Sequence, residues 1–283
     1  MLKISVITVS YNSASTISDT IRSVISQKGV HIEYIVVDGG SVDSTHSILE
    51  TYSKYIDKLI IESDNGIYDA MNKGIRISKG KYLFFLGSDD EFYQNSILEK
   101  ISLETENNDY GIIYGNVFNQ DTKQIVGGRV ELLDLCFHKI CHQAIFYHHS
   151  LFVTYGVYDI KMLVNADMLF NQIVFSSNRV SKRYVDLTIA IYSGTGFSSI
   201  NFDKCYWDKS IALYKKIFLG KITRSSIYSG LLPITKYSFT LKGLILSIEA
   251  IIYTGNFNLM KHWISHPFQY FKLFVKLKIL KLK

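Results

Sequence analysis

The stretch Lys81-Tyr-Leu-Phe-Phe-Leu-Gly-Ser-Asp-Asp-Glu91 leads an apolar run directly into two adjacent carboxylates. Residues 82–86 are typical of a strand that is buried in a parallel sheet, and ligands of open α/β sheets bind beyond the carboxyl ends of such strands. Asp89 and Asp90 would repel each other there unless a cation or strong donors neutralise them, and carboxylate oxygens suit Mg²⁺ or Mn²⁺. The pair is equally compatible with a solvated turn before a helix that starts near Asn95.

Apolar strands alternate with amphipathic helices before this stretch. The expected strands cover residues 4–9, 33–37 and 58–62, and the expected helices cover residues 17–25, 44–52 and 67–75. Apolar side chains in these helices recur at spacings of three and four residues, which places them on one face. Ser13 or Ser15 would cap the first helix, and Asp43 or Ser44 the second. The alternation predicts an α/β fold with a Rossmann-like, mostly parallel sheet flanked by helices.

Acidic side chains follow the predicted strands at their carboxyl ends. Asp38, Asp64 and the pair Asp89 and Asp90 come after successive strands. Right-handed crossovers bring the carboxyl ends of parallel strands to one edge of a sheet. Each acid alone is compatible with a helix cap or a turn, whereas together they predict a site at that edge.

The composition limits the class of protein. The 283 residues suffice for one large α/β domain with an appendage. Cys136, Cys141 and Cys205 form an odd set without paired spacing, so we expect no disulfide framework and a reducing compartment. The chain opens on a core strand without the layout of a signal peptide, and its longest apolar region, residues 243–253, is shorter than the roughly 20 residues of a membrane span. We therefore expect a cytoplasmic protein.

The middle of the chain offers weaker patterns. A strand over residues 110–118 is expected, followed over residues 121–129 by a hairpin or an excursion from the sheet. Residues 136–149 cluster Cys and His but lack the repeated pairs of a zinc site, which favours a polar loop over a substrate. Asp167 precedes an apolar helix and fits a helix cap as well as a functional carboxylate. The glycine-rich segment 193–199 lacks the third glycine of a dinucleotide fingerprint, which excludes a nicotinamide site there.

The C-terminal part is basic. Residues 1–199 contain 17 Lys and Arg against 22 Asp and Glu, whereas residues 261–283 contain 6 Lys and no acid. We expect residues 201–283 to form a helical, amphipathic extension whose tail, residues 266–283, lies on an anionic membrane surface, where each Lys adds about 1 kcal/mol. The alternatives are a solvated helix docked on the domain and a basic arm for nucleic acid. The many apolar residues of the tail favour the membrane and argue against nucleic acid.

Four motifs occur in the order found in one enzyme family. They are Ser5-Val-Ile-Thr-Val-Ser-Tyr-Asn12, Val37-Asp-Gly-Gly-Ser-Val-Asp-Ser-Thr45, Asp64-Asn-Gly-Ile-Tyr-Asp-Ala-Met-Asn-Lys-Gly74 and Gly80-Lys-Tyr-Leu-Phe-Phe-Leu-Gly-Ser-Asp-Asp90. In these motifs the chain resembles the inverting, GT-A fold glycosyltransferases of family 2, especially the bacterial enzymes of O-antigen, capsule and exopolysaccharide synthesis. The resemblance implies a GT-A catalytic domain over residues 1–200, with a nucleotide-sugar half (1–100) and an acceptor half (101–200).

The resemblance also implies which residues bind the nucleotide-sugar donor. They are Thr8, Tyr11, Asn12, Asp38, Asp64, Gly66, Lys73, Ser88, Asp89, His142 and Gln143. The first three would line the base pocket, where the base would stack on Tyr11. Asp38 would accept a charge-assisted hydrogen bond from a uracil N–H. His142 and Gln143 would contact the donor phosphates or the acceptor.

The resemblance also implies which acids bind the metal ion and accept the proton. The position of the family's Asp-X-Asp motif reads Ser88-Asp89-Asp90, so serine replaces the first acid. Asp90 is thereby implied to bind Mn²⁺ or Mg²⁺, which acts as a Lewis acid on the leaving diphosphate, and Asp89 to lie near the ribose or phosphate. Asp167 is implied to take the proton of the acceptor hydroxyl. The usual Glu before this acid is Ala166 here.

The expected function is transfer of a hexose or N-acetylhexosamine from a nucleotide diphosphate, with UDP favoured, to a lipid-linked oligosaccharide of O-antigen, lipopolysaccharide or capsule. The enzyme would act peripherally on the inner face of the cell membrane. A sugar nucleotidyltransferase is one alternative, but its glycine-rich N-terminal loop is missing. A sugar-nucleotide-binding module without turnover is another, and the presence of both Asp90 and Asp167 argues against it. The sequence indicates no oligomeric state.

Overall fold

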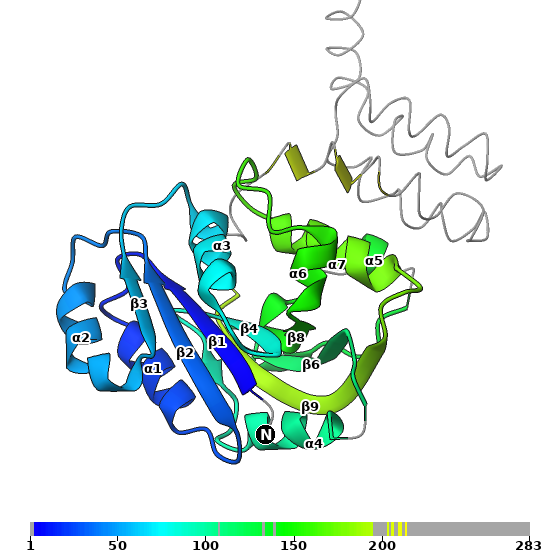
Figure 1. Ribbon diagram of the computed structural model, residues 1–283, viewed down its shortest axis with the longest axis horizontal. Coiled ribbons are helices and arrows are strands. Elements are labelled where there is room, and N and C mark those ends of the chain that lie inside the picture. The colour runs from blue at the N-terminus through cyan, green and yellow to red at the C-terminus, as the bar shows by residue number, and fades with distance from the viewer. Residues whose placement is uncertain are drawn as a thin grey trace, which may run out of the picture. The chain divides into compact units, whose positions relative to one another are not determined.

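The computed structural model describes residues 3–106, 108–131, 134–137 and 140–194, together with residues 203, 205, 206, 209, 210 and 213 (Figure 1). The chain comprises two compact units, one of residues 1–129 and 139–211 and the other of residues 130–138 and 212–283. Nearly all of the predicted extension over residues 201–283, its basic tail and most of the segment 193–199 lie outside the described residues. The predicted domain boundary at residue 200 stays a prediction.

The described elements follow the predicted alternation of strands and helices as far as the fourth strand. The strands are β1 (Lys3–Ser10), β2 (His31–Asp38), β3 (Lys58–Ile61), β4 (Tyr82–Gly87), β5 (Glu91–Phe92), β6 (Ile112–Asn119), β7 (Gln124–Val126), β8 (Ile145–His148) and β9 (Lys182–Tyr192). The helices are α1 (Ile17–Ile25), α2 (Thr45–Thr51), η1 (Ser53–Tyr55), α3 (Ile67–Ile77), α4 (Ile97–Glu104), α5 (Asp134–Phe137), η2 (His142–Ala144), α6 (Ser150–Tyr155) and α7 (Ala166–Ser176). Of these, α5 belongs to the second unit and the others to the first.

The first half of the sheet is parallel. Strands β3, β2, β1 and β4 lie side by side in that order, and the last residue of β1, Ser10, is opposite Asp38. Helix α3 packs on β1 and β2. Its close approach requires Gly74, because a Cβ atom there would lie 2.5 Å from Cγ2 of Ile7. The parallel order places the carboxyl ends of β2, β1 and β4 at one edge of the sheet.

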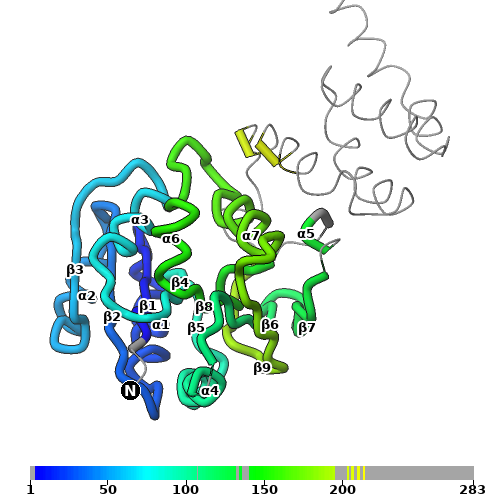
Figure 2. Tube along the Cα trace, turned by 45° about the vertical axis from the view of Figure 1, so that its right-hand side comes forward, coloured from blue at the N-terminus to red at the C-terminus, as the bar shows by residue number. Residues whose placement is uncertain are grey.

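The second half of the sheet is mixed. Strand β8 runs antiparallel between β4 and β6, β6 pairs in parallel with β9, and β7 forms the predicted hairpin with β6. Figure 2 shows that the strands are not placed in chain order, since β8 lies next to β4 and ahead of β6. Because Phe84 is opposite Phe146, the residues just before β8 lie at the carboxyl end of β4. The register therefore carries η2 to the edge where Asp89 and Asp90 follow β4.

An aromatic cluster fills the space between β4, β8, α6 and α7. Phe152 stacks on Phe170 with 4.7 Å between ring centroids, and Tyr147, Tyr158 and Phe85 contact these rings edge-on. Each such contact contributes about 0.5–1.5 kcal/mol beyond burial. The cluster fixes the start of α7, which carries Asp167, relative to the sheet.

Two predicted helix caps differ from the structure. The residue that caps α1 is Thr16, and neither Ser13 nor Ser15 does so, because the Ser13 hydroxyl bonds to Ser88 Oγ at 2.7 Å. Ser13 contributes its carbonyl to the first turn instead. The N-cap residue of α7 is Asn165. Asp167 therefore lies inside the first turn of the helix and is not its N-cap residue. Ser44 is the N-cap residue of α2, as predicted.

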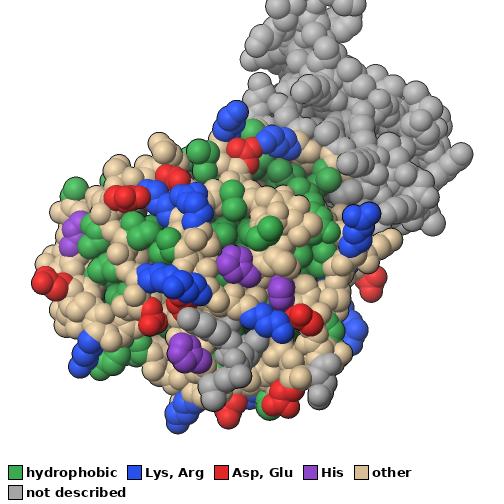
Figure 3. Space-filling view, in the orientation of Figure 1, with side chains coloured by type: hydrophobic (Ala, Val, Ile, Leu, Met, Phe, Trp, Pro, Cys, Tyr) green, Lys and Arg blue, Asp and Glu red, His purple; other side chains and the backbone are tan. Residues whose placement is uncertain are grey.

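Charges are mixed over the described surface. Figure 3 shows acidic and basic side chains interspersed on one face. No helix among the described residues is long and apolar enough to cross a membrane.

Candidate active site

The loop after β4 brings a buried carboxylate to the edge of the sheet. Asp90 is 3% exposed, and its Oδ2 accepts a hydrogen bond of 2.9 Å from the Gly87 amide. Glycine is required at position 87, because a Cβ atom there would lie 2.6 Å from Asp90 Oδ2 and 3.0 Å from Asp89 Oδ1. The end of β4 thus holds the buried carboxylate of Asp90 against the backbone, whereas Asp89 is exposed.

The environment of Asp90 disfavours its negative charge. Burial, followed by the charge of Asp89, raises the pKa of Asp90 to about 6, against the opposing effect of a hydrogen bond from Gln143. Its Oδ1 accepts no hydrogen bond from any residue in the described ranges. A buried acid with one open oxygen beside a second acid favours a cation nearby.

Helix η2 connects this acid to a second one. Gln143 Nε2 donates a hydrogen bond of 2.8 Å to Asp90 Oδ2. The preceding residue, His142, lies with its Nδ1 3.1 Å from Asp167 Oδ2. Two neighbouring residues therefore join carboxylates that are 77 positions apart in the chain. The structure brings Asp90, His142, Gln143 and Asp167 together.

Asp167 is held at both of its oxygens. Tyr68, from α3, donates a hydrogen bond of 2.6 Å to Oδ1, while His142 engages Oδ2. Burial raises the pKa of Asp167, but the hydrogen bond and charge of His142, together with the bond from Tyr68, outweigh burial and bring the pKa below its usual value. Asp167 is consequently ionised at neutral pH and able to accept a proton.

The imidazole of His142 responds to the surrounding acids. Burial lowers its pKa, but the hydrogen bond and charge of Asp167 and the charges of Asp90 and Asp89 outweigh burial, and the net pKa is raised. The surrounding acids therefore favour the protonated form of the ring.

Asp38 is a buried carboxylate at the end of β2. The residue is fully buried, and its two oxygens accept hydrogen bonds from Ser10, Gly40 and Ser41 and contact His46 Nε2 at 2.7 Å. Burial raises the pKa of Asp38, but bonds from Ser41, Ser10 and His46 outweigh it, so the pKa lies below its usual value. In this conformation the carboxylate organises the loop that follows β2.

The loops after β1, β2 and β4 are cross-linked. The Asn12 amide donates to Ser41 Oγ at 2.8 Å, and Asn12 Oδ1 accepts from the Val42 amide at 2.9 Å. Ser13 connects the same loop to Ser88 after β4. This network links the loops after β1 and β2 to the acid pair after β4.

The two remaining residues that were predicted to line the base pocket differ in exposure. Tyr11 is 63% exposed, so its ring is open to a stacking partner. Thr8 is fully buried, and its hydroxyl accepts a hydrogen bond of 3.3 Å from Tyr34.

The turn between β3 and α3 lies against the loop after β2. Asp64 Oδ1 accepts from the Gly66 amide at 2.8 Å, and the Asp64 carboxylate occupies the space that a side chain at Gly39 would need. Gly66 has a φ of +102°, which favours glycine where α3 begins. Lys73 pairs with Glu62 at 2.9 Å and steadies this turn.

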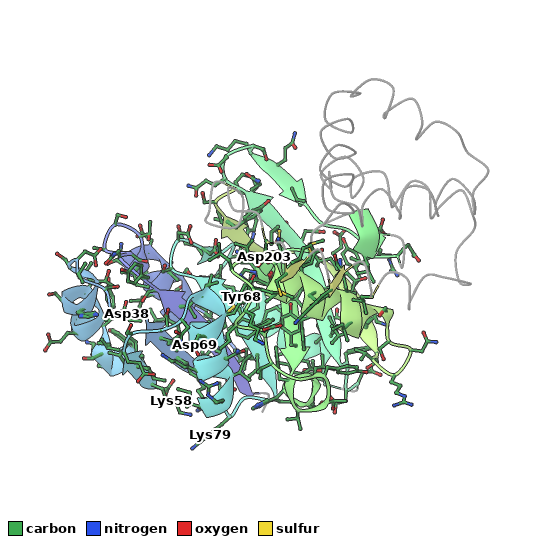
Figure 4. The ribbon with its side chains drawn as sticks, turned by 90° about the horizontal axis from the view of Figure 1, so that it is seen from above. Asp38, Lys58, Tyr68, Asp69, Lys79 and Asp203 are labelled. Atoms are coloured by element: carbon green, nitrogen blue, oxygen red, sulfur yellow. The ribbon has the colours of Figure 1, made fainter. Side chains whose placement is uncertain are left out.

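Figure 4 places Tyr68 between Asp38 and the later elements of the chain. Tyr68 is the site residue that sequence reasoning missed. It stands within the third motif, next to the stripe of Ile67 and Met71, and nothing in the apolar spacing separates it from a half-exposed helix residue. The described residues contain no cluster of three or more His, Cys, Asp or Glu suited to a metal ion, and neither Cys141 nor Cys205 is in a disulfide bond.

The chain belongs to glycosyl transferase family 2. Residues 5–158 match the model of this family. A "PGL/p-HBAD biosynthesis glycosyltransferase" of Mycobacterium bovis is 36% identical over 199 residues, which cover 68% of this chain and 77% of the relative. A "UDP-Glc:alpha-D-GlcNAc-diphosphoundecaprenol beta-1,3-glucosyltransferase" of Escherichia coli is 33% identical over 138 residues, covering 48% of this chain and 54% of the relative.

Solved structures agree on the fold. The S. aureus TarS fragment 1–349 in complex with UDP-GlcNAc matches with a TM-score of 0.68 at 16% identity, covering 88% of this chain and 80% of TarS. A mannosyltransferase from Pyrobaculum calidifontis in complex with GDP-Man and Mn²⁺ matches with a TM-score of 0.57 at 14% identity, covering 96% of this chain and 86% of that one. The predicted α/β fold of GT-A type is confirmed.

The donor set fits a divalent cation. Mg²⁺ and related ions are held in such sites by one or two carboxylates, with substrate phosphates and water completing the shell, so no larger protein cluster is needed. The open Oδ1 of buried Asp90 and the adjacent Asp89 supply this minimum. The cation would reverse the repulsion that raises the pKa of Asp90.

Proposed function

We propose that this chain is an inverting glycosyltransferase that moves a hexose or N-acetylhexosamine from a UDP-sugar to a lipid-linked oligosaccharide of a bacterial surface polysaccharide. The observation that carries the proposal is the pair His142 and Gln143. His142 contacts Asp167 and Gln143 contacts Asp90. The short helix η2 therefore holds the proposed proton acceptor, Asp167, near the acid that suits a cation, Asp90. Inversion by a single displacement needs both groups near one sugar carbon.

Asp167 takes the proton of the attacking acceptor hydroxyl. Its carboxylate is ionised, and Tyr68 and His142 hold its two oxygens in place. An oriented base of this kind contributes about 10²- to 10⁴-fold to rate. The proton moves from the hydroxyl to Asp167 as the oxygen bonds to the sugar carbon, and the diphosphate leaves from the opposite face.

The acid pair after β4 holds the diphosphate end of the donor. Asp90 would bind Mn²⁺ or Mg²⁺ through Oδ1, and Asp89 would lie near the ribose or phosphate. A divalent cation there supplies Lewis-acid stabilisation of the leaving diphosphate. Gln143 orients Asp90, and the protonated form of His142, which the nearby acids favour, would attract the phosphates.

The nucleoside lies over the loops after β1, β2 and β3. The exposed ring of Tyr11 stacks on the base, and Asn12, Asp64, Gly66 and Lys73 shape the pocket rim. Both carboxylate oxygens of Asp38 have hydrogen-bond partners in this conformation. Asp38 accepts a hydrogen bond from the uracil N–H only if the bond from His46 or from Ser41 breaks. Thr8 supports the pocket from below.

The acceptor is proposed to be lipid-linked, at an anionic membrane surface. The named reaction of the Escherichia coli relative, which uses a diphosphoundecaprenol acceptor, supports this choice. The lysine-rich sequence 266–283 supplies the charge and apolar residues for peripheral binding. A chain that ends at Ser265 should stay in solution when the full chain sediments with anionic vesicles, and equal sedimentation would remove this part of the proposal.

The donor is tested by a thermal-shift screen of the full chain. UDP-, GDP- and dTDP-sugars are compared with and without Mn²⁺. A ligand that binds only the native state raises the midpoint of unfolding. We expect UDP-sugars with Mn²⁺ to give the largest rise, and a larger rise with GDP- or dTDP-sugars would reject UDP as the donor nucleotide.

A further inference from the structure

We propose that Tyr68 is a positioning residue that orients Asp167 for proton transfer, an inference that rests on the proposed function. Its hydroxyl is the donor to Asp167 Oδ1, at 2.6 Å. The other oxygen, Oδ2, contacts Nδ1 of His142. Tyr68 and His142 thus each contact one oxygen of the Asp167 carboxylate.

The ring of Tyr68 is fixed by its surroundings. Tyr68 is 5% exposed, and its ring lies 5.5 Å from that of Tyr158, which belongs to the aromatic cluster around Phe152 and Phe170. Because the Tyr68 ring is packed in this way, its hydroxyl can move little relative to Asp167. The hydrogen bond to Asp167 is consequently directed by packing.

The helix that carries Tyr68 is tied to the same cluster. Asn72, one turn further along α3, donates from Nδ2 to the Tyr158 carbonyl at 2.8 Å and accepts from the Tyr158 amide at 3.0 Å. A paired amide contact of this kind fixes both distance and rotation. It locks α3 in the register that points Tyr68 at Asp167.

Tyr68 remains a donor at all pH values at which the enzyme would work. Burial, followed by the charge and hydrogen bond of Asp167, raises the pKa of Tyr68 well above its ordinary value. His142 donates as a cation only while it is protonated, whereas the phenol keeps its proton. Tyr68 therefore supplies the permanent part of the stabilisation of ionised Asp167.

The position of Tyr68 gives the third motif a second role. Gly66 and Asp64 form the turn at the donor side, and Tyr68 follows two residues later on the first turn of α3. One short segment therefore joins the proposed donor rim to the proposed base. A helix that moved away from the donor would also release Asp167.

The test compares Tyr68→Phe with the control Tyr155→Phe in the full chain. Tyr155 makes a hydrogen bond of similar length, 2.8 Å, to Ser177 Oγ, away from Asp167. UDP release from UDP-sugars is followed with Mn²⁺ across pH. We expect Tyr68→Phe to lower kcat about 10- to 100-fold, which corresponds to the free energy of a hydrogen bond to a charged group. The KM for the donor should be unchanged. The acidic limb of its profile should move to higher pH, because loss of the donor raises the pKa of Asp167.

A Tyr68→Phe enzyme that matches Tyr155→Phe in kcat and in the acidic limb would overturn the proposal. If Tyr68→Phe does not fold, 3-fluorotyrosine at position 68 replaces it, since its more acidic hydroxyl should move the acidic limb to lower pH. An unmoved limb would then overturn the proposal.

A direct titration separates this proposal from the proposed function. Carboxyl ¹³C shifts of labelled aspartates are followed by NMR, with Asp167→Asn assigning the signal. If the wild-type chain releases no UDP from any sugar donor, the proposed function fails on its own. Tyr68 still orients Asp167 if its removal raises the titration midpoint of that signal, and an unchanged midpoint refutes the positioning role.

Discussion

Nδ1 of His142 lies 3.1 Å from Oδ2 of Asp167, and the pair joins η2 to the first turn of α7. The raised pKa of His142 and the lowered pKa of Asp167 describe one coupled contact, in which burial opposes charge on both groups and their mutual attraction prevails. Since a buried pair of this kind is costly to break at one partner, its effects should appear in stability as well as in activity.

The His142 contact predicts a pH-dependent loss of stability in His142→Gln. A histidine whose folded pKa is raised stabilises the fold fully below its unfolded pKa of about 6.5 and loses this contribution as pH rises through the folded pKa. The wild-type advantage in free energy of unfolding should be largest near pH 6 and shrink toward pH 9. Urea unfolding at both pH values measures it, and an advantage that grows with pH would contradict the coupling.

The raised pKa of Asp90 predicts that Asp90→Asn is more stable than the wild type without metal. The folded pKa of about 6 exceeds the unfolded value, so ionisation costs stability above pH 6, and this cost disappears below about pH 4. Asparagine keeps an oxygen for Gly87 and Gln143. We expect a gain on the order of 1–3 kcal/mol at pH 7.5, measured by unfolding in chelator, and no gain at pH 4. A loss at pH 7.5 would show that the buried charge is already compensated.

Asp38→Ala should destabilise the parallel half of the fold. The substitution removes the acceptor for Ser10, Gly40 and Ser41 in a fully buried position, with an expected cost of about 3–5 kcal/mol. The lowered pKa means that the wild-type contribution is present above the unfolded pKa and is lost as pH falls through the folded pKa. Asp64→Ala, in a more exposed turn, is the control and should cost under about 1 kcal/mol. Equal costs in urea unfolding would refute the organising role of Asp38.

Glu33 provides a buried acid that should affect stability and not turnover. It accepts from Ser5 Oγ at 2.5 Å and pairs with Lys58 at 3.1 Å, toward the amino ends of β1 and β2 and away from the acid pair. Burial raises its pKa, but these partners and the Lys79 amide lower it overall. Glu33→Gln should cost about 1–3 kcal/mol in unfolding and leave kcat unchanged at 25 °C. A fall in kcat in a chain that is still folded would show that the two ends of the sheet are coupled.

The parallel half of the fold could be predicted because its signals are local. Apolar runs such as residues 82–86, each followed by an acid and an amphipathic helix, determine strand type and the edge where Asp38 and Asp90 lie. The carboxyl-edge position of Asp90 followed from that pattern alone. Its Gly87 contact did not, because a close approach depends on three-dimensional packing.

The mixed half of the sheet was less predictable, because it depends on pairing between distant segments. β8 has four residues, and nothing in Ile145–His148 indicates that it runs antiparallel beside β4. That register is what brings His142 and Gln143 to the acids. The burial of Tyr68 likewise depends on α7, which lies about 100 residues further along the chain.

Turnover by paired variants tests the account most directly. Purified full-length protein is mixed with Mn²⁺, labelled UDP-sugars and membrane extract, and transfer is compared for wild type, Asp90→Asn, Asp167→Asn and the control Asp159→Asn, whose acid pairs with Lys209 outside the site. The account predicts that Asp90→Asn and Asp167→Asn each lose at least about 100-fold in kcat while Asp159→Asn keeps wild-type activity. Undiminished transfer by both Asp90→Asn and Asp167→Asn would contradict it.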